Sequence, residues 1–384
     1  MTVPLGYCTN VHAGVDFEQT RANLERCALA VKQRFSPREP MGIGLWLSAS
    51  AARKLLADAQ VPAFAAWLAE VGLVPFTFNG FPFGDFHQRV VKHQVYRPTW
   101  FEPARAAYTR DLIQIMHGVL PPGMTGSIST LPITWGTPYP TPDELHASAA
   151  ALRGIAGNLA RLERETGRLI TLCLEPEPGC VIQFSNDVLR FFEEFLLRGH
   201  DEKPLRRHLR VCHDVCHAVV MFEEQEAVLR RYHAASIGVG KVQVSSAVCL
   251  SLERTPPEQR GAALQQLVGF DEDRYLHQTV VRAAPGSAPV FYEDLPAALA
   301  TQPGDSRAEW RVHFHVPIYL QRFGYLEASQ QAIRDCLRTV TELRLTDHFE
   351  VETYAWGVLP AELQQPDLAA GIAEEMAWFR ELRG

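Results

Sequence analysis

Short apolar runs alternate along the chain with longer segments whose apolar residues recur every three or four positions. The first pattern is typical of buried β-strands and the second of amphipathic helices. We expect strands at residues 5–10, 42–47, 74–80, 126–131, 169–179, 209–216, 237–246 and 348–354. Helical patterns lie at residues 16–35, 50–71, 102–120, 141–166, 186–197, 218–235, 327–343 and 367–383.

This alternation of strands and helices predicts repeated βα units and a parallel sheet. Eight such strands in 384 residues indicate an α/β fold, a closed (β/α)8 TIM barrel that occupies residues 1–384 as a single domain. Residues 247–309 interrupt the alternation after the seventh strand, so we expect an insertion largely outside the barrel, and a small second domain there stays open. Residues 310–318 are predicted to form an additional strand.

Composition limits the partners of the protein. The formal net charge is −7 and the two signs are interspersed, so we do not expect generic nucleic-acid binding. No apolar run reaches about 18 residues, and the N-terminus lacks a charged region followed by an apolar core. These features predict a soluble, cytoplasmic protein without a membrane span. A homo-oligomer stays open.

The segment 209–218 places an acid and an imidazole together at the end of a predicted strand. Alternation along the strand puts Asp214 on one face with Cys212 and Cys216, two small apolar neighbours. A carboxylate in such surroundings needs a partner or a metal, and His217 lies three residues further on. The alternative is structural, because Asp214 would also suit the N-cap of the helix that follows.

Two further acids end predicted strands, Glu175 in the fifth and Glu352 in the last. If Glu175, Asp214 and Glu352 face the barrel axis together, their charges repel unless a cation lies among them. His313 and His315 share one strand face and could add imidazole to the carboxylate oxygens. Such a donor set suits Mn, Zn, Fe or Co better than calcium, and Mg is a further candidate for the divalent metal ion.

Three motifs carry a resemblance to known proteins. The segments 174–176 (Leu-Glu-Pro), 213–218 (His-Asp-Val-Cys-His-Ala) and 351–353 (Val-Glu-Thr) resemble the metal-binding strand ends of the xylose isomerase-like superfamily of sugar isomerases, epimerases and endonuclease IV-type enzymes. Within it, residues 79–87, 95–100, 126–132 and 277–278 make the chain similar to the EboE family of bacterial metabolite-traffic operons.

The resemblance implies that Glu175, Asp214 and Glu352 bind a metal, and that His217 binds substrate or a second metal. The superfamily commonly offers a histidine from strand seven, whereas this chain has Gln243 there. An amide oxygen is a weaker ligand than imidazole for a transition metal. We therefore expect His315, rather than His313, to complete the site or to lie next to the metal, with Gln243 as the alternative ligand.

These residues predict a metal-dependent enzyme of isomerase or epimerase type that acts on a polyhydroxylated or carbonyl metabolite. Glu175 or Glu352 would act as the base, and Lys241 and His217 would orient substrate oxygens. We expect residues 81–100 to close the barrel mouth, and Asn79, His87 and Lys92 to approach it. A carrier barrel without turnover and a metal-dependent hydrolase are the alternatives.

Overall fold

The computed structural model describes residues 5–12, 14–301, 306–365 and 367–384. Eight parallel strands form one sheet in the order β1-β14-β7-β6-β5-β4-β3-β2, and a parallel bridge between Cys8 and Gly44 joins its two ends. The predicted eight-stranded barrel is thus confirmed. Its strands are β1 (Gly6–Tyr7), β2 (Met41–Trp46), β3 (Leu73–Asn79), β4 (Gly126–Thr130), β5 (Ile170–Leu174), β6 (Leu209–Asp214), β7 (Val239–Val244) and β14 (Phe349–Val351).

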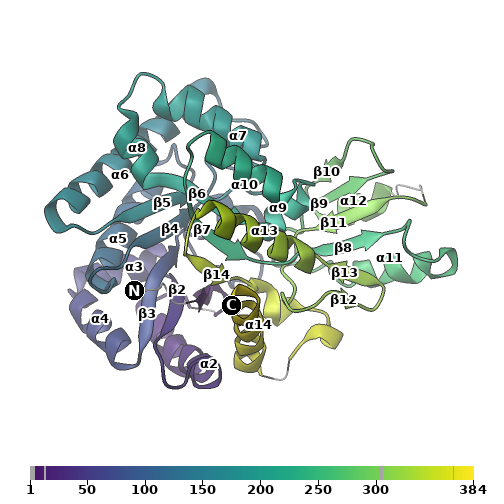
Figure 1. The fold of residues 1–384 in the computed structure, drawn as a ribbon, viewed down its shortest axis with the longest axis horizontal. Helices are drawn as coiled ribbons and strands as arrows, with labels where there is room; N and C mark the ends of the chain where they lie inside the picture. The colour runs from purple at the N-terminus through teal and green to yellow at the C-terminus, as the bar shows by residue number, and fades with distance from the viewer. Residues whose placement is uncertain (1–4, 13, 302–305, 366) are drawn as a thin grey trace.

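Helices surround the barrel, and several strands are buried along their whole length, as expected for a parallel sheet covered by helices (Figure 1). The longest helix begins at the capping box of Thr141 and Glu144, as the sequence predicts, and ends at Gly167 with φ 73°. The helices of the barrel are α1 (Phe17–Asn23), α2 (Leu29–Phe35), α3 (Ala49–Ala57), α4 (Val61–Glu70), α5 (Pro103–Val119), α6 (Pro142–Thr166), α7 (Ser185–Phe191), α8 (Glu202–His208), α9 (Val215–Val220), α10 (Gln225–Ala234), α13 (Gln330–Leu343) and α14 (Leu368–Arg383).

After β7, where the sequence predicts an insertion, the chain forms a second sheet, which lies to the right of the barrel in Figure 1. It is antiparallel, with strand order β10-β9-β11-β8-β13-β12, and it is accompanied by α11 (Arg260–Val268) and α12 (Leu295–Thr301). Its strands extend beyond residue 309. They are β8 (Val248–Ser251), β9 (Thr279–Arg282), β10 (Val290–Tyr292), β11 (Glu309–Val312), β12 (Arg322–Phe323) and β13 (Leu326–Ala328).

The predicted strand at 310–318 is wrong beyond Val312, where β11 ends. After Val312 the chain leaves the second sheet and turns back toward the barrel. The backbone N–H of His313 donates to the carbonyl of Gln278, and that of Val316 donates to the carbonyl of Ser246, just after β7. These contacts bring a segment of the insertion to the carboxyl ends of the barrel strands.

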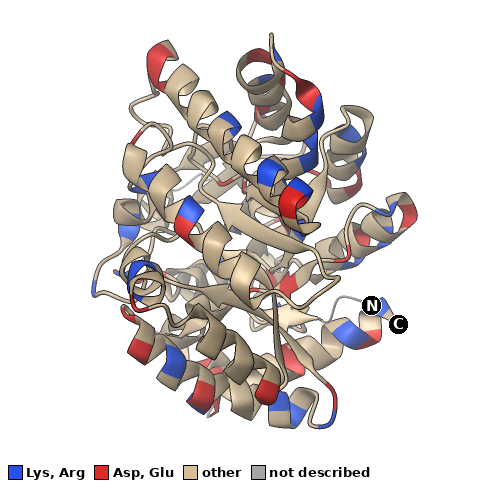
Figure 2. Ribbon diagram, turned by 90° about the vertical axis from the view of Figure 1, so that its left-hand side faces the viewer, with Lys and Arg blue, Asp and Glu red and all other residues tan. Residues whose placement is uncertain are grey.

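The barrel interior contains a buried ion pair between Lys241 on β7 and Glu350 on β14. Neither side chain is exposed, so each charge depends on the other for compensation. On the outer surface, acidic and basic residues alternate along the helices (Figure 2). Among the residues that the structure describes, no helix is long and apolar enough to cross a membrane.

Candidate metal centre

The carboxyl ends of β5, β6 and β14 bring three acidic side chains together. Glu175 directly follows β5, Asp214 is the last residue of β6, and Glu352 directly follows β14. One carboxylate oxygen from each of the three lies within 4.8 Å of the others, and all three residues are buried. The structure thus places the three acids that the sequence singles out in one confined site.

The two oxygens of Asp214 are suited to the two roles that the sequence left as alternatives. As the N-cap of α9, its Oδ1 accepts hydrogen bonds from the backbone N–H of His217 and from the hydroxyl of Ser245, each at 2.8 Å. Its second oxygen, Oδ2, is buried and has no hydrogen-bond partner among the described residues. Cap and candidate ligand are therefore different oxygens of the same carboxylate.

Two asparagines orient Glu352. Its Oε1 accepts hydrogen bonds from Asn10 Nδ2 at 2.7 Å and from Asn79 Nδ2 at 3.0 Å. Asn79 was predicted to approach the barrel mouth, and it contacts the site through this carboxylate. Because both amides hold the same oxygen, the other oxygen of Glu352 stays available to a ligand.

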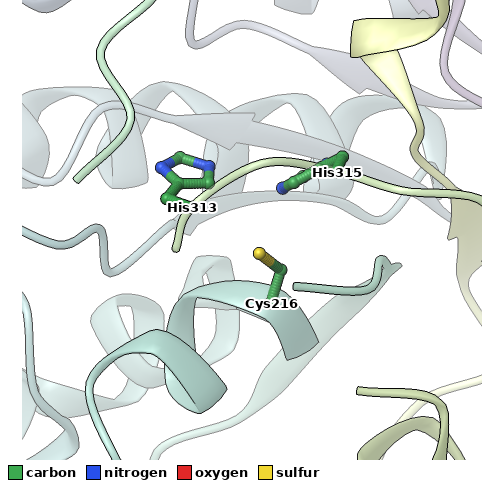
Figure 3. Close-up of side chains that lie close together, drawn as sticks. All are labelled: Cys216, His313 and His315. Carbon is green, nitrogen blue, oxygen red and sulfur yellow. The ribbon is translucent and has the colours of Figure 1, made fainter. Parts of the chain in front are cut away.

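Both histidines of the segment after β11 reach the site, not only the one that the sequence favours. His315 donates from Nδ1 to the carbonyl of Glu352 at 2.8 Å, and its Nε2 lies 4.0 Å from Asp214 Oδ2. His313 lies beside it, and the thiol of Cys216 points to the gap between the two imidazoles (Figure 3). A hydrogen bond that fixes Nδ1–H leaves Nε2 of His315 as a free acceptor, the form that binds metals.

Burial and mutual repulsion change the acidity of the three acids. Burial, with a contribution from Asp214, raises the pKa of Glu175 to about 7. Burial, followed by the charges of Glu175 and Asp214, raises the pKa of Glu352 well above its usual value. Burial also opposes ionisation of Asp214, but His217 and His315 outweigh it, so the pKa of Asp214 is lowered. Without a cation, the site therefore favours one ionised carboxylate over three.

Two further predicted site residues, Gln243 and Lys241, lie on β7. Gln243 is fully buried on β7, in register with Asp214, and neither amide atom has a hydrogen-bond partner among the described residues. Lys241 lies deeper, paired with Glu350 inside the barrel, and is not among the residues that line the cavity.

The two basic residues from the loop over the mouth also have partners. Lys92 lines the cavity, and its ammonium group lies 2.7 Å from Asp294 Oδ2. His87 does not line the cavity and instead contacts the backbone carbonyl of Asn10 at 2.6 Å. His87 therefore supports an asparagine that orients Glu352, and Lys92 is the only one of the two with access to a ligand.

A cavity opens above the acids. Acids and imidazoles form its floor, whereas much of its wall is apolar or aromatic, contributed by Phe81, Phe86, Tyr96, Tyr275, Leu276 and Tyr354. The segment 81–100 supplies part of this wall, so it covers the mouth in this structure. The lining of this cavity suits a small molecule with a polar end and an apolar side.

The sequence did not single out Glu177 as part of the site. This residue is buried, and its Oε1 accepts hydrogen bonds from Tyr96 Oη at 2.7 Å and from Gln278 Nε2 at 3.0 Å. Burial raises its pKa. The available signal was the repeat Glu-Pro-Glu-Pro at 175–178, in which two prolines hold both acids next to the end of β5.

No family model and no curated protein sequence matches this chain. Several solved structures match it in fold. The probable 3-DHS dehydratase AsbF from Bacillus anthracis matches with a TM-score of 0.50 and 12% identity, covering 98% of each chain. A xylose isomerase-like TIM barrel protein from Mycobacterium smegmatis, in complex with magnesium, matches with a TM-score of 0.50 and 14% identity over 100% of this chain and 97% of that chain. The chain therefore has the xylose isomerase-like TIM-barrel fold.

Proposed function

We propose that this protein is a metal-dependent enzyme of isomerase or epimerase type that acts on a small polyhydroxylated or carbonyl metabolite. The observation that carries the proposal is the convergence of Glu175, Asp214 and Glu352, three buried acids whose oxygens lie within 4.8 Å of one another. Three acids in such a place are strongly unfavourable unless a divalent cation compensates their charge.

The residues present fit such a cation. Glu175 Oε2, Asp214 Oδ2 and His315 Nε2 are buried atoms without hydrogen-bond partners among the described residues. Together with Glu352 they offer carboxylate oxygens and one imidazole nitrogen, a donor set suited to Mn, Zn, Fe or Co, with Mg as a further candidate. Gln243 lies on the adjacent strand in register with Asp214, but His315 lines the cavity and Gln243 does not, so His315 is the better candidate for the remaining ligand.

When a divalent cation is bound, carbonyl and hydroxyl oxygens of a ligand are polarised and the adjacent C–H becomes more acidic. Glu175 lines the cavity, so its carboxylate is placed to accept a proton from a ligand and to return it. Asn10 and Asn79 hold Glu352 in one orientation, so it could receive a proton on the other side of the ligand. Phe81 and Phe86 help to exclude water.

From the resemblance of the sequence to the EboE family, we further propose that this activity serves bacterial metabolite traffic in the cytoplasm. A carrier role without turnover is the second candidate, and the apolar wall of the cavity favours it, because few polar groups there are free to bind the hydroxyls of a sugar. Among the polar lining residues, Asn10 and Asn79 already donate to Glu352, and Lys92 is paired with Asp294.

Proton abstraction tests the enzyme against the carrier. We expect protein supplied with Mn²⁺ or Co²⁺ to exchange the C–H next to the carbonyl of at least one ketose, aldose or cyclic hydroxyketone with deuterium from D2O, measured by NMR. The substitution Glu175→Gln should slow this exchange by roughly 100-fold or more, because the amide cannot accept the proton.

The exposed substitution Glu253→Gln is the matched control and should leave the exchange rate unchanged. Exchange at the wild-type rate in Glu175→Gln would remove this residue as the base. Binding of such ligands with no exchange at all would favour the carrier.

A further inference from the structure

A buried acid lies behind the site, on the C-terminal helix α14. Glu375 is 1% exposed and does not line the cavity. Its carboxylate accepts hydrogen bonds from the backbone N–H of Ile318 at 3.0 Å, the hydroxyl of Thr353 at 2.6 Å and the indole N–H of Trp356 at 3.1 Å. Burying a carboxylate costs free energy that an apolar side chain would not. The reason for an acid at this position therefore lies in the three groups that it holds.

Two of these donors belong to the two segments that carry proposed metal ligands. Thr353 directly follows Glu352, and Ile318 lies three residues after His315. Both donate to the same oxygen of Glu375, its Oε1. A single atom of α14 therefore joins the end of β14 to the segment that returns from the insertion.

The third donor, Trp356, packs directly on the helix. A Cβ at Gly371, one turn before Glu375 on α14, would lie 2.6 Å from Cη2 of the Trp356 indole. The indole therefore lies against bare helix backbone, with its N–H on Glu375 Oε2. Trp356 belongs to the short helix after β14 that begins at Tyr354, whose ring centroid lies 4.7 Å from that of His315 in the cavity wall. The contact with α14 thus also holds this part of the wall.

The two ligand-bearing segments are joined a second time inside the site. His315 Nδ1 donates to the carbonyl of Glu352 at 2.8 Å. This bond connects the segments on the side of the cavity, and Glu375 connects them on the side of α14. A single hydrogen bond allows the segments to turn about it, whereas two connections on opposite sides do not.

We propose that Glu375 is a positioning residue that sets Glu352 and His315 at the separation at which both can bind one cation. It touches neither of them and acts through Thr353 and Ile318. The inference rests on the proposed function for the assignment of the two ligands. It adds a residue of an outer helix to the residues on which the site depends.

A purely structural role is the competing explanation, in which the carboxylate only compensates buried N–H groups and stabilises the docking of α14. Two substitutions test the bridge from its two ends. Glu375→Met removes all three hydrogen bonds at a similar volume. Thr353→Val removes only the hydroxyl and leaves Glu375 with Ile318 and Trp356 as partners, so it keeps the test decisive if Glu375→Met does not fold. Circular dichroism shows whether each variant is folded.

Hydrogen exchange of the metal-free protein, followed by mass spectrometry, measures how firmly the two segments are held. The backbone N–H of Val316 bonds to the carbonyl of Ser246, that of Glu352 bonds to the carbonyl of Val244, and neither bonds to Glu375. We expect both substitutions to speed the exchange of these two amides by about tenfold or more. Burial raises the pKa of Glu375 to about 7, so the measurement is made at pH 8, where its carboxylate is mostly ionised.

Metal affinity then measures the effect on the site. We expect Glu375→Met and Thr353→Val to weaken the binding of Zn²⁺ by roughly 10-fold, the lower end of what the loss of a supporting residue costs. The absorption spectrum of bound Co²⁺ should change as well, because it reports the coordination geometry. The double variant should bind no more weakly than Glu375→Met alone, since both substitutions break the same bridge.

Two controls separate positioning from stability. Glu374→Met makes the same change at the exposed neighbouring residue, and Ile155→Val removes a methylene group from the buried face of α6. Ile155→Val should lower the stability, and both controls should leave the two amides, the affinity for Zn²⁺ and the Co²⁺ spectrum as in wild type.

The outcomes are distinct. Unchanged exchange of both amides in folded Glu375→Met and Thr353→Val overturns the inference, and so does lowered stability with wild-type metal affinity and an unchanged Co²⁺ spectrum. Additive losses in the double variant also overturn it. A wild-type protein that binds neither Zn²⁺ nor Co²⁺ removes the proposed metal site, and it overturns the inference as well, because the two residues would then not be ligands. Wild-type binding with the expected losses supports both.

Discussion

Replacing Asp214 by alanine should lower the affinity of the site for a divalent cation by roughly 100-fold or more. Loss of a residue that only supports a ligand already costs about 10- to 100-fold, and Asp214 would be a ligand itself. The substitution also removes the N-cap of α9, whose Oδ1 holds the backbone N–H of His217 at 2.8 Å. Titration of chelator-treated protein with Zn²⁺ or Mn²⁺, followed by calorimetry, measures the change.

The substitution Asp214→Asn separates the capping role of this side chain from its proposed role as a metal ligand. Asparagine is as good an N-cap as aspartate, whereas loss of the cap in Asp214→Ala costs about 1 kcal/mol of stability. We therefore expect Asp214→Asn to keep near-native stability as far as the helix is concerned, but to bind the cation much more weakly than wild type. Wild-type affinity in both variants would show that the carboxylate of Asp214 holds no metal.

Replacing Gly44 by alanine should destabilise the protein more than any change on its surface. A Cβ at this position would lie 1.3 Å from Glu350 Oε1 and 2.4 Å from Glu350 Cδ. The side chain of Glu350 must then move away from Lys241, and both residues are fully buried. Breaking a buried ion pair costs about 3–5 kcal/mol. Chemical denaturation, read as the midpoint and the free energy of unfolding, measures the loss.

Gly154→Ala is the matched control for this prediction. Gly154 lies inside α6, and no heavy atom beyond its own helix backbone lies within 4 Å of a Cβ placed there. In a helix, alanine stabilises by about 0.5–1 kcal/mol relative to glycine. An unchanged midpoint in Gly44→Ala would mean that Glu350 does not fill the barrel interior beside this strand.

The barrel was predictable because its signals are local. Each strand is a short apolar run, and the capping box at Thr141 and Glu144 marks the start of its longest helix. The path of the insertion was not predictable in the same way. The run after Trp310 continues to alternate, but the strand ends at Val312 because the chain leaves its pairing with β8 and β9 to return to the barrel.

The location of the three acids was predictable, because each lies at the end of a strand and the alternation of side chains directs it toward the barrel axis. The location of the other side chains of the site was not. The alternation of side chains along β7 directs Lys241 toward the barrel axis, but it does not tell how far below the mouth the residue lies. In the structure the partner of Lys241 is Glu350, not a ligand. His313 and His315 share the site because a loop, not a strand, carries them there. Glu177 joins it through Gln278, a residue 101 positions away, and no local pattern predicts such a contact.

The central claim is that the acids at the barrel mouth bind a divalent metal ion. Elemental analysis of the protein, purified without chelator and without added metal, tests this claim most directly. The account predicts at least about one equivalent of Mn, Zn, Fe, Co or Mg per chain, lost in Asp214→Ala. A folded wild-type protein that contains no such metal and takes none up when it is offered would contradict it.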